Sequence, residues 1–365
     1  MRDATLVTTQ SQLDAAVFRL EAATRLAIDT EFMRERTYYP LLCLVQVATD
    51  TDCFLVDPLA GLELGALHGL LVDRSKLKIL HAARQDLEVL QLGGRPVPAP
   101  VFDTQAAAAM LGFPPQAGYA ELVARQLGHS IDKGQTRTDW ARRPLTPEQL
   151  AYAADDVHHL LTLHTELSTA LEARGRAAWL EEDAAALEDV ALYRTEPGDA
   201  WRRLKGLGRL KPREQAVARA LAEWRERRAI ESDKPRGWIL TDEAIYAVAT
   251  MAPRTTADLE AIRALPPAVA RKRGEELLAL VASAIESAGA TGIEVSGRRP
   301  TPTENALVSK LQQMVRDEAA ALDLSPEVLA TRRDVEALVF EDRGESAVLR
   351  GWRRVVVGEK LLAEK

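Results

Sequence analysis

The first two hundred residues alternate short apolar runs with longer segments of helical spacing. Three runs, Leu26–Asp29, Leu41–Thr49 and Cys53–Val56, are rich in apolar and β-branched residues and end at polar or proline-containing turns. These runs predict neighbouring strands of one sheet. Two shorter runs, Lys78–His81 and Val101–Asp103, predict further strands of the same sheet.

Segments with helical spacing lie between and after these runs. We expect helices over Ser11–Ala22, Ala82–Leu92 and Thr104–Leu111, with Ser11 as the N-cap of the first. The longest predicted helix covers Thr146–Arg174, because its first threonine is a good N-cap and a proline follows at the first helical position. Strands that alternate with helices predict an α/β fold in which helices flank a mixed sheet.

Strand-like runs stop near residue 193, and the remaining sequence is helical in pattern with proline and glycine breaks. A chain of 365 residues is expected to form two or three domains. We predict domains over residues 1–192, 197–288 and 300–365, the last two all helical. The breaks at Glu196–Gly198 and Gly289–Thr303 are the expected linkers.

Composition restricts the class of protein and its location. The chain is 47% hydrophobic and 28% charged, so it can bury substantial cores. Its cysteines, Cys43 and Cys53, lack CxxC spacing and are expected to be free thiols in a reducing cytoplasm. No signal peptide and no apolar stretch of about 18 residues is visible, so we expect no membrane association.

Charge is distributed unevenly. The whole chain carries −7, yet residues 201–275 contain 17 Lys and Arg against 10 Asp and Glu. This segment is either a basic module that contacts nucleic acid or a solvated helical surface with an excess of arginine.

Acidic residues in three separate blocks carry the candidate chemistry. Asp29 and Glu31 lie two positions apart on a predicted strand, so their side chains point to the same face. Asp86 lies near a helix start, and Tyr152 and Asp156 are four apart on one helix face. Carboxylates gathered at the edge of a core repel one another unless cations lie between them. Each block could also be an ordinary surface turn, helix face or dipole partner.

Two hard cations about 3.5–4 Å apart can clamp an in-line phosphoryl displacement, activating water on one side and stabilising the leaving oxygen on the other. We expect Tyr152 to orient the attacking water. A divalent-metal phosphodiesterase is therefore the leading hypothesis for the acidic blocks.

Longer motifs carry a family resemblance. The matching stretches are Ile28–Phe32, Arg36–Pro40, Leu44–Gln46, His81–Leu87, Thr136–Trp140, Arg143–Leu145 and Tyr152–Asp156. Together they resemble the tyrosine-bearing DEDD exonucleases, and within them the ribonuclease D family. The resemblance implies an RNase H-like fold and Mg²⁺ or Mn²⁺ at Asp29, Glu31, Asp86 and Asp156. It also implies Tyr152 beside the attacking water and release of 5′-nucleotides from an RNA 3′ end.

Other residues are candidates for RNA contact. Phe32 and Met33 follow the acidic pair and would pack against the terminal nucleotide or the core. Gln135, Arg137 and Trp140 lie in a polar stretch that approaches the active site in the family. His81 is expected to be structural, and Asp155 faces about 100° away from Asp156 on the helix.

Trp201–Ile285 resembles an HRDC domain, the helical module shared by helicases and ribonuclease D. Cations placed to match phosphate spacing would bind an RNA backbone. The candidates are Arg202, Arg203, Lys205, Arg209, Lys211 and Arg213. The tryptophans of this segment, Trp201, Trp224 and Trp238, are expected in its core, and Thr303–Lys365 resembles a second, divergent HRDC-like domain.

The leading functional hypothesis is a 3′-to-5′ exoribonuclease that trims structured RNA such as transfer RNA precursors. Its expected partner is RNA with a 3′ end, and the sequence indicates no obligate protein partner. The alternatives are a DNA 3′-to-5′ exonuclease and a non-catalytic RNA-binding scaffold.

Overall fold

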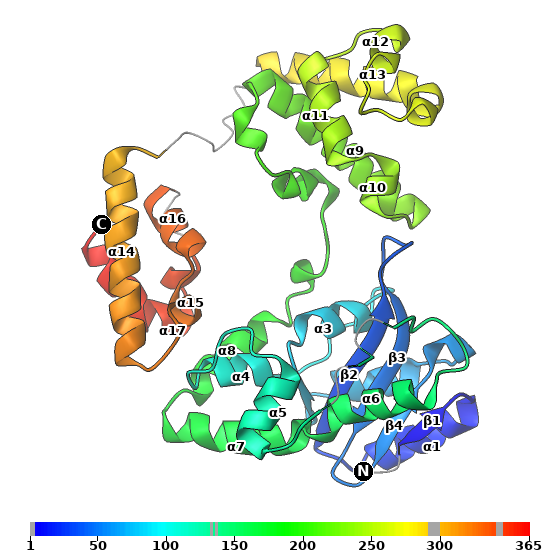
Figure 1. Cartoon of the computed structure of the whole chain (residues 1–365), viewed down its shortest axis with the longest axis vertical. Coiled ribbons are helices and arrows are strands. Elements are labelled where there is room, and N and C mark those ends of the chain that lie inside the picture. Colours follow the sequence, from blue (N-terminus) through cyan, green and yellow to red (C-terminus); the bar gives the residue numbers. More distant parts are fainter. Residues whose placement is uncertain (1–3, 132–133, 136–137, 291–299, 341–345) are drawn as a thin grey trace. The chain divides into compact units, whose positions relative to one another are not determined.

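The computed structural model describes residues 4–131, 134–135, 138–290, 300–340 and 346–365 (Figure 1). Contacts divide the chain into two compact units. The first contains Met1–Met33, Leu41–Val190 and Pro300–Lys365, and the second contains Arg34–Pro40 and Ala191–Arg299. The predicted domain boundaries stay predictions, and most of the second predicted linker lies outside the described residues.

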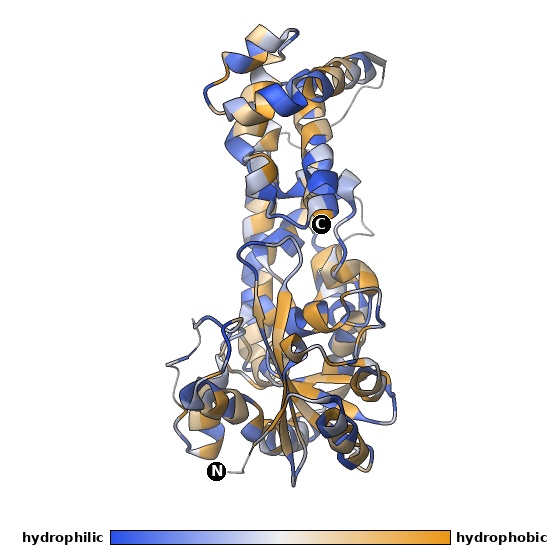
Figure 2. Cartoon of the chain, turned by 90° about the vertical axis from the view of Figure 1, so that its right-hand side faces the viewer, coloured by the Kyte–Doolittle hydropathy of each residue, from blue (hydrophilic) through white to orange (hydrophobic). Residues whose placement is uncertain are grey.

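A six-stranded mixed sheet forms the centre of the first unit, in the order β1-β4-β3-β2-β5-β6. Its strands are β1 (Thr5–Val7), β2 (Arg25–Met33), β3 (Leu41–Ala48), β4 (Cys53–Val56), β5 (Leu77–Leu80) and β6 (Val101–Asp103). β2 runs antiparallel to β3 and parallel to β5. Apolar residues concentrate in these strands (Figure 2). The five predicted strands are confirmed, and β1 was missed because three residues carry no readable alternation.

β2 extends well beyond the predicted strand. Its pairing with β3 continues from Ala27 opposite Ala48 to Met33 opposite Leu41. Asp29 and Glu31 therefore lie inside the strand rather than at its end. The register shifts between Glu31 and Phe32, an irregularity of the kind that occurs beside active sites.

Eight α-helices accompany the sheet in the described part of the first 190 residues. They are α1 (Gln10–Leu20), α2 (Gly65–Val72), α3 (Arg84–Leu90), α4 (Thr104–Ala109), α5 (Tyr119–Leu127), α6 (Pro147–His158), α7 (Leu160–Ala173) and α8 (Ala177–Ala186). Thr146 caps α6 as predicted, with a capping box to Gln149. The predicted N-cap Ser11 is wrong, because Thr9 caps α1. The predicted long helix is also interrupted, since His159 separates α6 from α7.

The C-terminal helices share a hydrophobic core with the sheet. They are α14 (Pro302–Ala321), α15 (Pro326–Leu329), α16 (Arg332–Phe340), α17 (Gly351–Arg353) and α18 (Glu359–Ala363). The Trp352 ring stacks on Trp179 of α8, with centroids 4.3 Å apart. The Arg353 guanidinium donates both to Asp183 Oδ1 at 2.6 Å and to Asp183 Oδ2 at 2.9 Å. Bidentate ion pairing and aromatic stacking together fix these helices to α8.

The second unit is helical around a buried apolar core. Its α-helices are α9 (Pro212–Ser232), α10 (Arg236–Ile239), α11 (Asp242–Met251), α12 (Thr256–Glu260) and α13 (Pro267–Ala290), preceded by short 3₁₀ turns at Pro197–Arg203 and Leu207–Arg209. Trp224 is buried as predicted. Trp238 is 62% exposed, so its predicted core position is wrong.

Residues Arg34–Pro40, which follow β2 in the chain, belong to this second unit. The Tyr38 hydroxyl donates to Glu226, whose side chain is fully buried, and Arg236 pairs with the same carboxylate. The Arg236 guanidinium also lies over the Tyr38 ring, 4.7 Å from its centroid. The Asp233 carboxylate accepts the N–H groups of Tyr38 and Tyr39. These contacts anchor the segment to the helices of the second unit.

Within the described residues, every helix is too short or too polar to cross a lipid bilayer.

Gly351 tests the attachment of the C-terminal helices. Its φ is +48°, and an added Cβ would overlap the Glu182 carboxylate, which accepts the Trp352 N–H at 2.9 Å. Gly351→Ala should therefore lower the free energy of unfolding by about 1–3 kcal/mol. Thermal and urea unfolding measure this change.

Gly69→Ala is the matched control, because Gly69 lies inside α2 with open space around its Cα. This variant should be neutral or more stable by about 0.5–1 kcal/mol. Equal unfolding free energies for the two variants would contradict the assigned packing at Gly351.

Candidate active site

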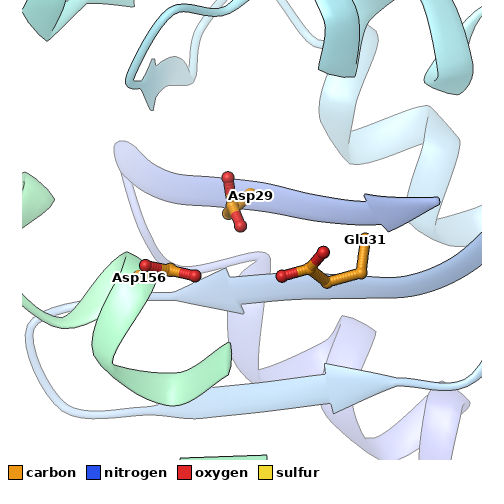
Figure 3. Close-up of side chains that lie close together, drawn as sticks. All are labelled: Asp29, Glu31 and Asp156. Atoms are coloured by element: carbon orange, nitrogen blue, oxygen red, sulfur yellow. The ribbon is translucent and has the colours of Figure 1, made fainter. Parts of the chain in front are cut away.

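Three acidic side chains from β2 and α6 converge (Figure 3). One carboxylate oxygen from each of Asp29, Glu31 and Asp156 lies within 4.8 Å of the others. Asp29 and Glu31 share one face of β2 because side chains alternate along a strand. Asp156 reaches them from the third turn of α6, although 125 residues separate it from Glu31 in the chain. The predicted convergence of these two blocks is present in the structure.

Asp86 approaches from the first turn of α3. It lies outside the group of three, but its negative charge is close enough to raise the pKa of both Asp29 and Glu31. The Thr30 hydroxyl donates to Asp86 Oδ1 at 2.5 Å. Thr30, which lies between the two acidic residues of β2, therefore links Asp86 to the same strand.

Burial and mutual repulsion disfavour ionisation of this group. Burial raises the pKa of Asp29 well above its usual range, and the charges of Asp86, Asp156 and Glu31 add to this effect. The pKa of Glu31 rises to about 9, first through burial and then through Asp156 and Asp86. Burial also raises the pKa of Asp86 to about 7 and that of Asp156 to about 7.

Such a group of oxygen donors fits hard divalent cations. Bound cations would offset the mutual repulsion of the carboxylates and would allow all of them to ionise. The residues that could hold them are Asp29, Glu31, Asp156 and, from α3, Asp86.

Tyr152 precedes Asp156 by one helical turn and hydrogen-bonds to its carboxylate, which lowers the pKa of Asp156 against the effect of burial. The Trp140 ring lies behind Tyr152, with centroids 6.0 Å apart. Trp140 is only 2% exposed, so its predicted direct contact with RNA is wrong. Its place is in the core, where it supports the Tyr152 ring.

Two polar residues at the site were given no role from the sequence, although Gln46 lies in one of the matching stretches. Gln46 lies opposite Asp29 on β3, and its fully buried amide donates to Asp29 Oδ2 at 3.4 Å. The Tyr119 hydroxyl donates to the Asp155 carbonyl at 3.1 Å and accepts the His159 N–H at 3.2 Å. Tyr119 thus fixes the junction of α6 and α7, next to Asp156. Its role had no local signal, because α5 was not predicted and its contacts are 36 and 40 residues away.

The remaining residues predicted near the active site differ in their exposure to solvent. Phe32, Met33 and Gln135 are partly exposed, and Met33 also packs against the core. Substrate contact by these three stays a prediction, and Arg137 lies outside the described residues. His81 is structural as expected: one ring nitrogen lies 3.0 Å from the Ala117 carbonyl and the other 2.9 Å from the Thr104 hydroxyl.

The predicted RNA-binding cations lie in the second unit. Arg202 pairs with Asp199 at 2.9 Å, and Arg203 approaches Glu226 at 3.5 Å, while both stay more than half exposed. Lys205 is exposed. Arg203 therefore has a structural partner in addition to its predicted role.

Comparison with known families defines the class of protein. A family model described as 3′-5′ exonuclease matches residues 4–172, and an HRDC domain model matches residues 214–281. The protein is thus a 3′-5′ exonuclease that carries an HRDC domain.

Full-length relatives narrow this class. Ribonuclease D of Gluconacetobacter diazotrophicus is 40% identical over 370 residues, covering 100% of this chain and 93% of that protein. Ribonuclease D of Acidiphilium cryptum is 39% identical, covering 99% and 92%. The crystal structure of Escherichia coli RNase D, an exoribonuclease involved in structured RNA processing, matches with a TM-score of 0.90 and 30% identity over 99% of this chain and 98% of that one. The chain belongs to the ribonuclease D family, and it is a hydrolytic, metal-dependent 3′-to-5′ exoribonuclease.

The raised pKa values predict how stability depends on pH. A carboxyl whose pKa is higher in the folded state holds its proton there, so folding is favoured at low pH and loses stability as pH rises through the folded pKa. Without divalent metal, the melting temperature should fall from about pH 6 to about pH 9. Saturating Mg²⁺ should restore more stability at the higher pH, because protons compete with the cation for the carboxylates.

Glu31→Gln provides the control for other titrating groups. It removes one ionisation from the site, so its melting temperature in chelator should fall less steeply with pH than that of the wild type. An Mg²⁺-induced shift of equal size at both ends of the pH range would contradict the prediction.

Proposed function

We propose that this chain hydrolyses the last phosphodiester bond of RNA and releases 5′-mononucleotides, with two divalent cations held by Asp29, Glu31, Asp86 and Asp156. The observation that carries the proposal is the convergence of three carboxylates from β2 and α6 to within 4.8 Å. Bound cations supply positive charge that activates water and stabilises the leaving 3′ oxygen.

The protein's own groups have distinct tasks in this proposal. Asp29 and Glu31 offer oxygens from a part of β2 that is paired with β3 over both residues, so their separation is preset. Asp156 closes the group from α6. Tyr152 donates to Asp156, and from this position its hydroxyl oxygen can accept a hydrogen bond from the attacking water. Tyr152 would thereby orient that water toward the phosphorus atom.

We propose Mg²⁺ or Mn²⁺ as the metal. The donor set consists of carboxylates, and both cations prefer oxygen ligands. A site without sulfur or imidazole among its converging ligands gives zinc or copper no preferred donor.

The proposed substrates are structured RNAs with a 3′ extension, including transfer RNA precursors, processed in the cytoplasm. Support comes from the full-length similarity to the E. coli enzyme, which is described as involved in structured RNA processing. Residues 201–275 add an excess of positive charge to this argument, because contacts to phosphates dominate affinity for RNA.

Charge-neutral substitutions test the site. Asp29→Asn and Asp156→Asn should each lower the rate of nucleotide release on the order of a thousandfold or more, because each removes a charged ligand from the converging group. The measurement is mononucleotide release from a 3′-labelled RNA in Mg²⁺, with chelator as the metal-free reference.

Asp155→Asn is the matched control, since Asp155 lies next to Asp156 in α6 but outside the converging group. It should keep its rate within a few fold of the wild type. Full activity in either site variant would refute the assignment, provided that the protein is free of contaminating nuclease.

The choice between RNA and DNA is tested with paired substrates. Oligonucleotides of identical sequence, each with a structured 5′ part and a single-stranded 3′ tail, should be shortened faster as RNA, because the 2′-hydroxyl is the group that distinguishes the two. A transfer RNA with a 3′ extension should yield a product that ends near its folded stem. Preferential degradation of DNA would replace the proposed function by DNA 3′-to-5′ exonuclease activity.

A further inference from the structure

We propose that Asp103 is a positioning residue for Asp86: its carboxylate, at the end of β6, holds the turn from which α3 begins. The inference rests on the proposed function, in which Asp86 contributes to the metal site. It concerns a residue that supports the site from outside. Asp103 lies on β6, whereas Asp29 and Glu31 lie on β2.

Asp103 makes an unusual set of bonds for a helix cap. It caps its own helix α4 through Oδ1, which accepts the Gln105 N–H at 2.8 Å. The same oxygen accepts the Ala82 N–H at 3.0 Å, and Oδ2 accepts the Ala83 N–H at 2.9 Å. One carboxylate, itself 9% exposed, thus joins the start of α4 to the start of α3.

The turn that Asp103 holds is one that the sequence disfavours. Ala82 has a φ of +57°, in the left-handed region that residues with a Cβ rarely adopt. Ala83 occupies the N-cap position of α3 and has no side chain that could accept from the helix N–H groups. The N–H groups of Ala82 and Ala83 themselves are satisfied by Asp103, about 20 positions later in the chain.

Asp86 depends on this turn because α3 is short. The helix covers Arg84–Leu90, and Asp86 is its third residue. Its carboxylate is held on the other side by the Thr30 hydroxyl. A shift of the turn would move Asp86 relative to β2, and positions in an active site must be held to within about half an ångström.

His81 anchors the residue before the turn and provides an independent sign that this segment is fixed from several sides. A carbonyl can only accept, so the nitrogen facing Ala117 carries the proton. Burial lowers the pKa of His81. Its other ring nitrogen lies 2.9 Å from the Thr104 hydroxyl, which also bonds to the Leu80 carbonyl at 3.1 Å. Thr104 directly follows Asp103, so adjacent residues fix both halves of the turn.

Asp103→Asn tests the role, because an amide replaces one acceptor oxygen by a donor that faces backbone N–H groups. In the metal-free protein, amide hydrogen exchange over residues 82–86 should accelerate about tenfold or more. The Mn²⁺ concentration for half-maximal binding, measured by calorimetry, should rise by a similar factor. Adding Ala82→Gly, which removes the penalty of the left-handed turn, should recover part of both losses.

Thr9→Ala serves as the matched control. It also deletes a helix cap, at α1, and should leave exchange over residues 82–86 and the Mn²⁺ requirement unchanged. If Asp103→Asn does not fold, Ala82→Val tests the same turn while Asp103 is kept, since a β-branched residue strains it further. That variant should show the same faster exchange and weaker Mn²⁺ binding.

The proposal would be overturned if Asp103→Asn kept the wild-type rate of amide hydrogen exchange over residues 82–86 and the wild-type affinity for Mn²⁺. It would also be overturned if adding Ala82→Gly to Asp103→Asn recovered neither property. Wild-type values in a folded Ala82→Val would do the same where it stands in for Asp103→Asn. The exchange measurement needs neither metal nor RNA. An inactive wild-type protein would therefore refute the proposed function while leaving the support of α3 by Asp103 open to its own test.

Discussion

Repulsion between buried carboxylates is the constraint around which the exonuclease fold is organised. Four acidic side chains from β2, α3 and α6 influence one another's pKa inside the protein. Without cations this arrangement costs free energy, because charge is removed from water and placed next to like charge. The rest of the sheet and its helices must hold the carboxylates in place against that cost.

The structure meets this demand through partners from several elements. β2 is flanked by β3 and β5, so its backbone cannot shift independently of its neighbours. Thr30 binds Asp86, Gln46 binds Asp29, and Tyr152 binds Asp156. Tyr119 fixes the backbone beside Asp156. Each contact removes a direction in which repulsion could separate the group, and together they preorganise it for cations.

The sequence predicted those features that depend on local pattern. Five strands and the cap of α6 followed from alternation and capping chemistry. Spacing only permitted the convergence of Asp29, Glu31 and Asp156, and the family resemblance implied it. The acidic residues themselves ended the apolar pattern early, so the extension of β2 beyond them was not visible.

Features that depend on distant contacts could not be predicted. The break at His159 coincides with a hydrogen bond from its N–H to the Tyr119 hydroxyl, which lies 40 positions earlier in the chain. Trp140 was expected to contact RNA but is buried, and Trp238 was expected in the core but is exposed. The same side chain can face either the core or solvent, and the local sequence does not decide which. The left-handed Ala82 was invisible for the same reason, since its acceptor comes from β6.

The chain passes between its two units more than once, so the enzyme cannot be truncated to its nuclease sequence without removing native contacts. Cutting after residue 190 would leave Tyr38 without Glu226 and Arg236, and would strip α8 of the tryptophan stacked on Trp179. A fragment trimmed to the nuclease sequence alone would therefore expose apolar surface and orphaned polar groups at both places. Loss of activity in such a fragment would report damage to the nuclease fold as much as the absence of the HRDC domain.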